Sequence, residues 1–223
     1  MSKEPAVRRL ERTTMDAQSW DERYSAARDG EGLWSAQPHA ALAQIVTPLA
    51  PGTALDLATG DGRNGIWLAE RGWQVTAVDF SAAGLAVART RDTGAGAQRT
   101  GSIDWQLADV TRWNAARAYD LITMTYLQLA EQAIAEVITR ASRWLAPGGT
   151  LVVIGHDRDN LTGGTGGPQD PAVLYTPDML RAAADGLRIL AARQLTRNPA
   201  TDPESPGDNG QSAIDTLLHA VKD

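Results

Sequence analysis

The sequence predicts an α/β fold with one doubly wound, mostly parallel sheet of seven strands, a terminal antiparallel hairpin and N-terminal helices. Short apolar runs alternate with amphipathic segments of helical length through five successive units, which is typical of parallel strands joined by helices. Two more apolar runs, near residues 187–196 and 212–221, flank the turn-rich segment from Asn198 to Gly210 and therefore indicate an antiparallel pair.

The boundaries of the elements follow from local signals in order along the chain. Gly72 is a natural helix end, Ser81 caps the next helix, and Thr176 with Pro177 begins the last one as cap and first residue. The predicted strands are 53–58, 74–79, 103–107, 120–125 and 151–155, and the predicted helices are 16–28, 37–49, 63–71, 82–91, 131–145 and one from residue 176.

The chain is expected to form a single domain. Residues 1–15 are charged and aperiodic and are expected to be a flexible arm, so the domain spans 16–223, with 16–50 as an N-terminal helical lid. Residues 157–173 form a long glycine-rich loop, and loops of this length inside a domain are usually functional or disordered. We expect this loop to be the other part of the lid.

Composition narrows the class of protein. A formal net charge of -6 argues against nucleic acid or an anionic membrane as partner, because both favour basic patches. The absence of cysteine excludes disulfides, thiolate metal sites and cysteine nucleophiles, and the three histidines are spread along the chain, so no metal site is expected. No apolar run reaches the length of a membrane span, and the first residues lack the apolar core of a signal peptide, so a cytoplasmic location is expected.

Residues 53–64 carry the most information about function. An apolar run ends in the carboxylate Asp56 and is followed by a loop with Gly60 and Gly62 and by an amphipathic helix. A second apolar run ends about 20 residues later in Asp79, the position of a ribose-binding acid. Glycines let a ligand lie against the backbone, and a carboxylate can accept hydrogen bonds from two vicinal hydroxyls. This unit predicts an adenosine-containing cofactor; the alternative is a tight strand-to-helix turn without a ligand.

The loop does not suit a dinucleotide. Its spaced small residues are Ala58, Gly60 and Gly62, whereas a dinucleotide site uses G-x-G-x-x-G. The acids Asp56 and Asp61 would repel a diphosphate but suit a cofactor with a sulfonium and an amino group. The loop resembles motif I of class I S-adenosylmethionine-dependent methyltransferases, an acid and any residue before G-x-G-x-G. Ala58 replaces the first glycine, which is tolerable if Ala58 keeps a negative φ.

The resemblance extends over nearly the whole chain from about residue 18. Residues 56–81 resemble the tellurite-resistance and thiopurine methyltransferase-like branch, which commonly has Gly-Arg-Asn after motif I, here 62–64, and Val-Asp-Phe-Ser at the second strand, here 78–81. The segment Trp20-Asp-Glu-Arg-Tyr24 is similar too. The resemblance implies the Rossmann-like methyltransferase fold, with S-adenosyl-L-methionine as cofactor and S-adenosyl-L-homocysteine as product.

Cofactor residues are expected at the carboxyl ends of the strands, where ligands bind in such sheets. The resemblance implies that Asp56 holds the amino group, Asp79 the ribose hydroxyls and Asp109 the adenine amino group. Asp109 could instead cap a turn, and Trp34 could staple the N-terminal helices to the sheet instead of facing the sulfonium. The complete set of expected cofactor-binding residues is Tyr24, Trp34, Asp56, Ala58, Gly60, Gly62, Asp79, Phe80, Asp109, Val110 and Thr125.

Three residues are candidates for the reaction itself. Tyr126 follows the fourth strand, where the incoming nucleophile usually lies, although a packing role is the alternative. His156 ends the fifth strand and could remove a proton from the nucleophile, or it could bind the loop backbone. Arg197 ends the sixth strand and could clamp an anionic substrate, or it could be a surface arginine.

The resemblance implies methyl transfer by direct displacement, and the acidic charge and the expected lid favour a small-molecule substrate. As acceptor, the resemblance favours a thiol, a chalcogen oxyanion or another small nucleophile. Positioning supplies much of the catalysis in such a reaction, so a base is required only for a nucleophile with a proton of high pKa. A non-catalytic domain that senses S-adenosylmethionine or S-adenosylhomocysteine is the alternative, and a nicotinamide oxidoreductase is disfavoured by the acidic loop and the final hairpin. The sequence leaves the oligomeric state open.

Overall fold

Apolar and β-branched runs form the strands of this protein, and the amphipathic segments between them form the helices. The computed structural model describes residues 16–26, 33, 35–94, 99–197 and 212–223. Its strands are β1 Thr53–Leu57, β2 Gln74–Asp79, β3 Ser102–Leu107, β4 Tyr119–Thr125, β5 Leu145–His156, β6 Arg188–Arg197 and β7 Ala213–Val221. Its helices are α1 Ala17–Ala26, α2 Ala40–Val46, α3 Arg63–Glu70, α4 Ala82–Gly94, α5 Glu131–Trp144, α6 Asn160–Gly163 and α7 Pro177–Ala183, with a 3-10 turn, η1, at Pro171–Val173.

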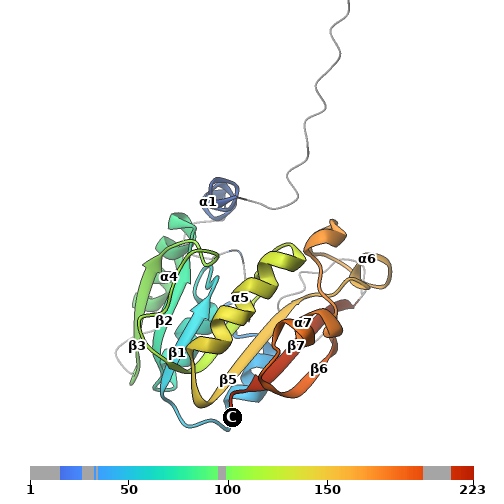
Figure 1. Cartoon of the computed structure of the whole chain (residues 1–223). Coiled ribbons are helices and arrows are strands. Elements are labelled where there is room, and N and C mark those ends of the chain that lie inside the picture. Colours follow the sequence, from blue (N-terminus) through green and yellow to red (C-terminus); the bar gives the residue numbers. More distant parts are fainter. Residues whose placement is uncertain (1–15, 27–32, 34, 95–98, 198–211) are drawn as a thin grey trace, which may run out of the picture.

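The seven described strands form one sheet in the order β3-β2-β1-β4-β5-β7-β6 (Figure 1). β1 pairs in parallel with both β2 and β4, so the strand order reverses beside β1. β7 is antiparallel to β5 and β6, and its residue Asp215 is in register with His156 at the end of β5. The beginning of β7 therefore lies at the edge where the parallel strands end, which is where ligands bind in sheets of this kind.

Each face of the sheet has its own apolar core. On one face, β-strand residues such as Leu55 and Leu57 pack with the buried side of α5, including Ile134 and Ile138, and with Leu180 of α7. On the other face, Leu42 of α2 and Leu68 of α3 belong to a second buried cluster. Figure 1 shows α5 and α7 on the near face of the sheet. Burial on both faces holds the strand ends in fixed positions.

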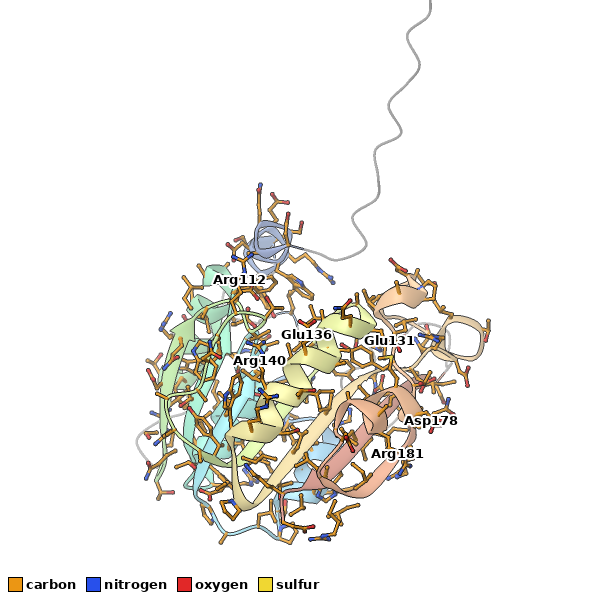
Figure 2. All side chains as sticks on the ribbon, viewed as in Figure 1. Arg112, Glu131, Glu136, Arg140, Asp178 and Arg181 are labelled. Carbon is orange, nitrogen blue, oxygen red and sulfur yellow. The ribbon has the colours of Figure 1, made fainter. Side chains whose placement is uncertain are left out.

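Arg140 of α5 ties this helix to the segment that follows β3. Its guanidinium donates to the backbone oxygens of Val110 at 2.9 Å and Trp113 at 3.0 Å (Figure 2). The segment after β3 contains two of the expected cofactor-binding residues, Asp109 and Val110. Arg140 therefore fixes the backbone of the segment that contains these two residues.

The structure confirms the predicted fold class, including the terminal antiparallel hairpin and the N-terminal helices. β2 begins and ends at the predicted residues, but α2 is shorter than the predicted 37–49 helix. The predicted loop 157–173 is not purely irregular, since it contains α6 and η1. Within the described parts of the chain, every helix is too short or too polar to cross a membrane.

Candidate active site

The loop after β1 folds back on itself through three left-handed residues. Ala58 has φ +57°, Gly60 φ +59° and Gly62 φ +81°. The expectation that Ala58 keeps a negative φ is therefore wrong. The left-handed region costs an alanine roughly 1–2 kcal/mol, because its Cβ approaches the following carbonyl oxygen. The loop retains the geometry of three glycines although one of them is replaced.

Asp56 is completely buried beneath this loop. Its two carboxylate oxygens accept hydrogen bonds from the Thr59 hydroxyl, at 2.6 Å, and from the Thr123 hydroxyl, at 2.7 Å. Burial raises the pKa of Asp56, and the two threonine hydroxyls oppose that shift. Asp56 thus links the loop to β4, the next strand in the sheet.

Asp79 lies at the end of β2 and faces the loop. One carboxylate oxygen accepts from the Gly60 backbone N–H and the other from the Ser81 backbone N–H, each at 2.8 Å. Burial raises the pKa of Asp79, and these backbone donors oppose the shift. A carboxylate oxygen has lone pairs for more than one donor, so Asp79 can still accept hydrogen bonds from a vicinal diol. The acidic, glycine-containing cradle fits a cofactor with a ribose and no phosphate.

The residues expected near the adenine follow the ends of β2 and β3, two neighbouring strands. Phe80 is half-buried directly after Asp79, and Val110 is buried after β3. Asp109 accepts from the backbone N–H and the hydroxyl of Thr111, at 2.9 and 2.7 Å, and so caps the turn that follows β3. Both of these hydrogen bonds go to the same carboxylate oxygen of Asp109, Oδ1.

The side chain of Tyr24, on α1, packs against the loop after β1 at Gly60. A Cβ built on Gly60 would lie 2.5 Å from the Tyr24 hydroxyl oxygen, so only a glycine permits this contact. Tyr24 is buried although its neighbours on α1 are exposed. The other expected cover, Trp34, lies outside the described residues.

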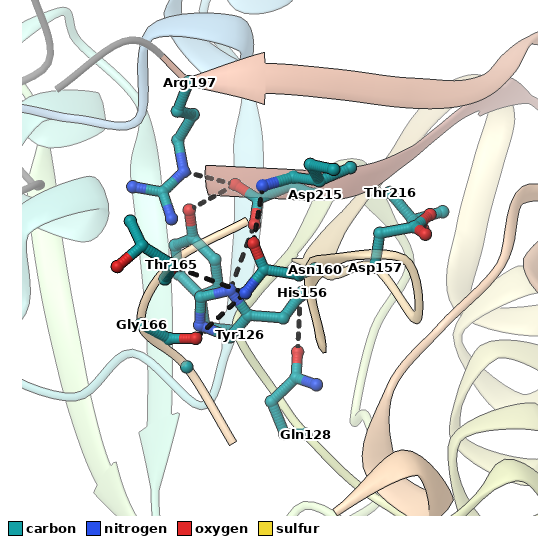
Figure 3. A network of polar contacts seen from close by, with 12 residues as sticks. Tyr126, Gln128, His156, Asp157, Asn160, Thr165, Gly166, Arg197, Asp215 and Thr216 are labelled. Atoms are coloured by element: carbon teal, nitrogen blue, oxygen red, sulfur yellow. Dashed lines mark hydrogen bonds and ion pairs between the residues drawn. The ribbon is translucent and has the colours of Figure 1, made fainter. Parts of the chain in front are cut away.

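The three expected reaction residues meet at a carboxylate that the sequence analysis did not include. Asp215 of β7 is fully buried and accepts hydrogen bonds from the Tyr126 hydroxyl at 2.8 Å and from Arg197 Nε at 2.5 Å (Figure 3). His156 Nδ1 lies 3.1 Å from the other carboxylate oxygen. Burial alone would raise the pKa of Asp215, but contacts with His156 and His39 and the charge of Arg197 hold it well below its usual value. We call these five residues the Asp215 cluster.

Tyr126 is the centre of the aromatic contacts in this cluster. Its ring centroid is 4.8 Å from that of His156 and 5.8 Å from that of His39, and the guanidinium carbons of Arg63 and Arg197 lie 5.7 and 5.5 Å from it. Burial, and then the charge of Asp215, raise the pKa of Tyr126 well above its usual value. The phenol is therefore protonated and donates to the carboxylate.

His156 is held between β7 and the glycine-rich loop. A Cβ on Gly167 would lie 2.9 Å from two carbons of the His156 ring, so the loop backbone packs directly on the imidazole. The loop itself is fastened by Asn160, which donates to the Gly166 carbonyl at 2.9 Å and accepts from the Ile214 N–H at 2.8 Å (Figure 3). The ring has a carboxylate on one nitrogen and a tight backbone contact on its other side.

His39 brings α2 into the same site. Its Nδ1 accepts from the Ala41 N–H at 3.2 Å, which caps α2 and leaves the proton on Nε2. Nε2 lies 3.8 Å from Asp215 Oδ2, beyond hydrogen-bond distance. Burial lowers the pKa of His39 although Asp215 opposes this shift, so the ring is neutral. Asn64 accepts from the His39 backbone N–H at 3.1 Å and donates to the Thr125 hydroxyl at 2.7 Å.

The structure thus brings the predicted residues Tyr126, His156 and Arg197 together, around Asp215 and beside His39, neither of which was predicted from the sequence. An acid near the beginning of an apolar strand was the available signal for Asp215, since an antiparallel final strand begins at the carboxyl edge of the sheet. His39 gave no comparable signal, because its position depends on how α2 packs. Within the part of the chain that the structure describes, no group of three or more His, Asp or Glu side chains could hold a metal ion.

Residues 54–149, from β1 into β5, match the methyltransferase domain family. No curated protein is significantly similar to this sequence. Among solved structures, TehB from Haemophilus influenzae is similar over 93% of this chain and 67% of its own, with 16% identity and a TM-score of 0.67.

Two further solved structures show the same fold. The N-methyltransferase NodS from Bradyrhizobium japonicum WM9, in complex with S-adenosyl-L-homocysteine, is similar over 92% of this chain and 97% of its own, with 16% identity and a TM-score of 0.67. A structure that concerns the conversion of a disulfide bond into a thioacetal group during echinomycin biosynthesis covers 93% and 91%, with 17% identity and a TM-score of 0.68. The chain therefore has the fold of these methyltransferases, and its residues 54–149 match the methyltransferase domain family.

Proposed function

We propose that this protein is an S-adenosylmethionine-dependent methyltransferase that acts on a small molecule bound at the Asp215 cluster. The observation that carries the proposal is the convergence of Tyr126, His156 and Arg197 on one buried carboxylate, beside the end of β4. The formal net charge of -6 and the cover formed by Tyr24 favour a small enclosed acceptor over a macromolecule.

The cofactor belongs in the cradle formed by the β1 loop and Asp79. In this proposal Asp79 accepts hydrogen bonds from the ribose hydroxyls, Phe80 offers a face to the adenine, and the loop from Ala58 to Gly62 borders the methionine part. Asp56 is buried and bonded to two threonines, so it acts by holding the loop in shape. When bound, S-adenosylmethionine supplies an electrophilic methyl group on a sulfonium.

His156 is the group positioned to remove a proton from the acceptor. Because Asp215 lies 3.1 Å from Nδ1, the carboxylate favours the tautomer with a proton on Nδ1 and a lone pair on Nε2. An acceptor with a proton of high pKa needs this base. A thiolate or a reduced chalcogen anion does not, and for such an acceptor His156 and Arg197 position the nucleophile.

The structural relatives favour no single acceptor chemistry, since one is named as an N-methyltransferase and another concerns sulfur chemistry. The test is therefore the formation of S-adenosylhomocysteine from S-adenosylmethionine with four separate acceptors: 2-mercaptoethanol, catechol, selenite and benzylamine. We expect product above the blank with at least one acceptor, and a loss of about 100-fold in His156→Gln if the acceptor requires a base. Binding of S-adenosylhomocysteine without turnover of any acceptor would favour the non-catalytic sensor.

A further inference from the structure

Helix α1 is fastened to the beginning of α4 by one carboxylate. Asp21 Oδ1 accepts from the Ser81 hydroxyl at 2.6 Å and from the Ala83 N–H at 3.0 Å. Ser81 in turn accepts from the Gly84 N–H at 2.9 Å, so the first turn of α4 is capped jointly by its own serine and by α1. These hydrogen bonds lower the pKa of Asp21, the Ser81 hydroxyl contributing most. Figure 1 shows α1 beside α4 at the edge where the parallel strands end.

A second contact places α1 directly over the cofactor cradle. The Tyr24 hydroxyl lies above Gly60, and the Tyr24 ring lies against Gly84, where a Cβ would come within 2.9 Å of Cε2. Two glycines on separate elements therefore make room for the same side chain. The phenol occupies the space above the loop that borders the methionine part of the cofactor.

The two residues whose backbone N–H groups bind Asp79, Ser81 and Gly60, also contact α1. The Ser81 backbone N–H donates to Asp79 Oδ1 while its hydroxyl donates to Asp21, and the Gly60 N–H donates to Asp79 Oδ2 beneath Tyr24. Asp79 is thus surrounded by donors that also contact α1. A ligand on Asp79 would lie under the helix, with the Asp21–Ser81 contact on one side and Tyr24 on the other.

We propose that α1 is a cover over the bound cofactor and that Asp21 is the positioning residue that keeps it closed. This inference rests on the cofactor site of the proposed function and adds a residue that acts on it through Ser81. Exchange of S-adenosylhomocysteine for S-adenosylmethionine requires the Asp21–Ser81 contact to open. The strength of this contact therefore limits the rate at which product leaves.

The test measures the dissociation of radiolabelled S-adenosylhomocysteine from the full chain after addition of excess unlabelled ligand. We expect Asp21→Ala to raise the dissociation rate about tenfold, which corresponds to roughly 1.4 kcal/mol. Asp21→Asn keeps an oxygen that can accept from Ser81 and Ala83, so it is expected to restore most of the wild-type rate. Glu22→Gln, one residue further on the exposed side of α1, is the matched control and should leave the rate unchanged.

Gly84→Ala tests the contact between Tyr24 and α4. The added methyl group displaces the Tyr24 ring, and alanine is more favourable than glycine within the α4 helix. The substitution should also raise the dissociation rate, without lowering the melting temperature. Rates within twofold of wild type in both Asp21→Ala and Gly84→Ala would overturn the proposal while leaving the cofactor site intact. A wild-type protein that binds no S-adenosylhomocysteine would overturn the proposed function, and this cover with it.

Discussion

Tyr126 and Asp215 are 89 residues apart in the sequence, and the Tyr126 hydroxyl donates a hydrogen bond of 2.8 Å to the Asp215 carboxylate. Tyr126 reaches the carboxylate from a left-handed backbone, with φ +60°. A bulky residue pays roughly 1–2 kcal/mol for this conformation, and such strain is typical of functional sites. Ala58, at the end of the neighbouring strand, is the other described non-glycine residue with positive φ. Both strained positions border the proposed reaction site.

Replacing Asp215 by asparagine is expected to destabilise the protein by about 3 kcal/mol, because asparagine keeps the shape but loses the buried charge that offsets Arg197. Urea unfolding at pH 7 measures this difference. Asp185→Asn, on an exposed position after α7, is the control and should change stability by less than about 0.5 kcal/mol. Equal stability of Asp215→Asn and wild type would contradict the ionised state of Asp215.

The contribution of His39 to stability is expected to fall as the pH drops below about 6.5, the ordinary pKa of histidine. The folded pKa of His39 is lowered by burial, so the unfolded chain binds the proton first and unfolding becomes more favourable. The loss amounts to at most about 1.4 kcal/mol per pH unit for one such histidine. His219, whose pKa is also lowered by burial, adds to the same trend.

His39→Asn isolates the contribution of His39, since asparagine can still cap α2. Urea unfolding at pH 5, 6, 7 and 8 should show a weaker pH dependence in this variant than in wild type. The same pH dependence in both proteins would mean that His39 is not held neutral in the folded state. Asp215 does not contribute within this range, because its pKa is lowered and its stabilisation is lost only below the ordinary aspartate pKa.

Gly167→Ala is expected to slow methyl transfer about tenfold or more by displacing the His156 ring. Gly166→Ala is the matched control: the two glycines have φ +70° and +74°, but a Cβ on Gly166 would meet nothing within 4 Å. Both variants carry the same backbone strain, so steady-state rates of S-adenosylhomocysteine formation compare the contact alone. Equal rates in the two variants would contradict a role for His156 in the reaction.

Ala58→Gly is expected to stabilise the protein by about 0.5–1 kcal/mol. Glycine relieves the left-handed strain, and its greater freedom in the unfolded chain offsets part of the gain. Thermal unfolding measures the change. Ala54→Gly, in the regular part of β1, should destabilise instead, and a loss of stability in Ala58→Gly would argue against the positive φ of Ala58.

Local patterns in the sequence predicted the parallel part of the sheet and the cradle around Asp79. The period of apolar residues and the glycine spacing lie within about 30 residues of chain, so β1, α3 and β2 are visible without tertiary information. The final hairpin was predicted as well, and its direction placed Arg197 at the correct edge.

The Asp215 cluster could be predicted only in part. Tyr126, His156 and Arg197 follow or end strands, and the rule for ligand sites in α/β sheets selects such positions. Asp215 lies at the beginning of its strand, whereas the rule was applied to residues at strand ends, so Asp215 was not selected although the predicted antiparallel direction places it at the same edge of the sheet. The capping of α4 by Asp21 joins residues 60 positions apart and depends on how α1 packs, which no local pattern encodes.

The cofactor assignment is tested most directly by thermal unfolding with S-adenosylhomocysteine or NADH, for wild type and Asp79→Asn. Asparagine is the better substitution here, because its one carbonyl oxygen can still accept from the N–H group of Gly60 or Ser81, whereas alanine would leave both without an acceptor. At about 100 times its dissociation constant, S-adenosylhomocysteine should stabilise wild type by roughly 2.7 kcal/mol, NADH should have no effect, and Asp79→Asn should lose most of the shift. A shift with NADH alone, or an equal shift with S-adenosylhomocysteine in both proteins, would contradict the cofactor site described for this chain.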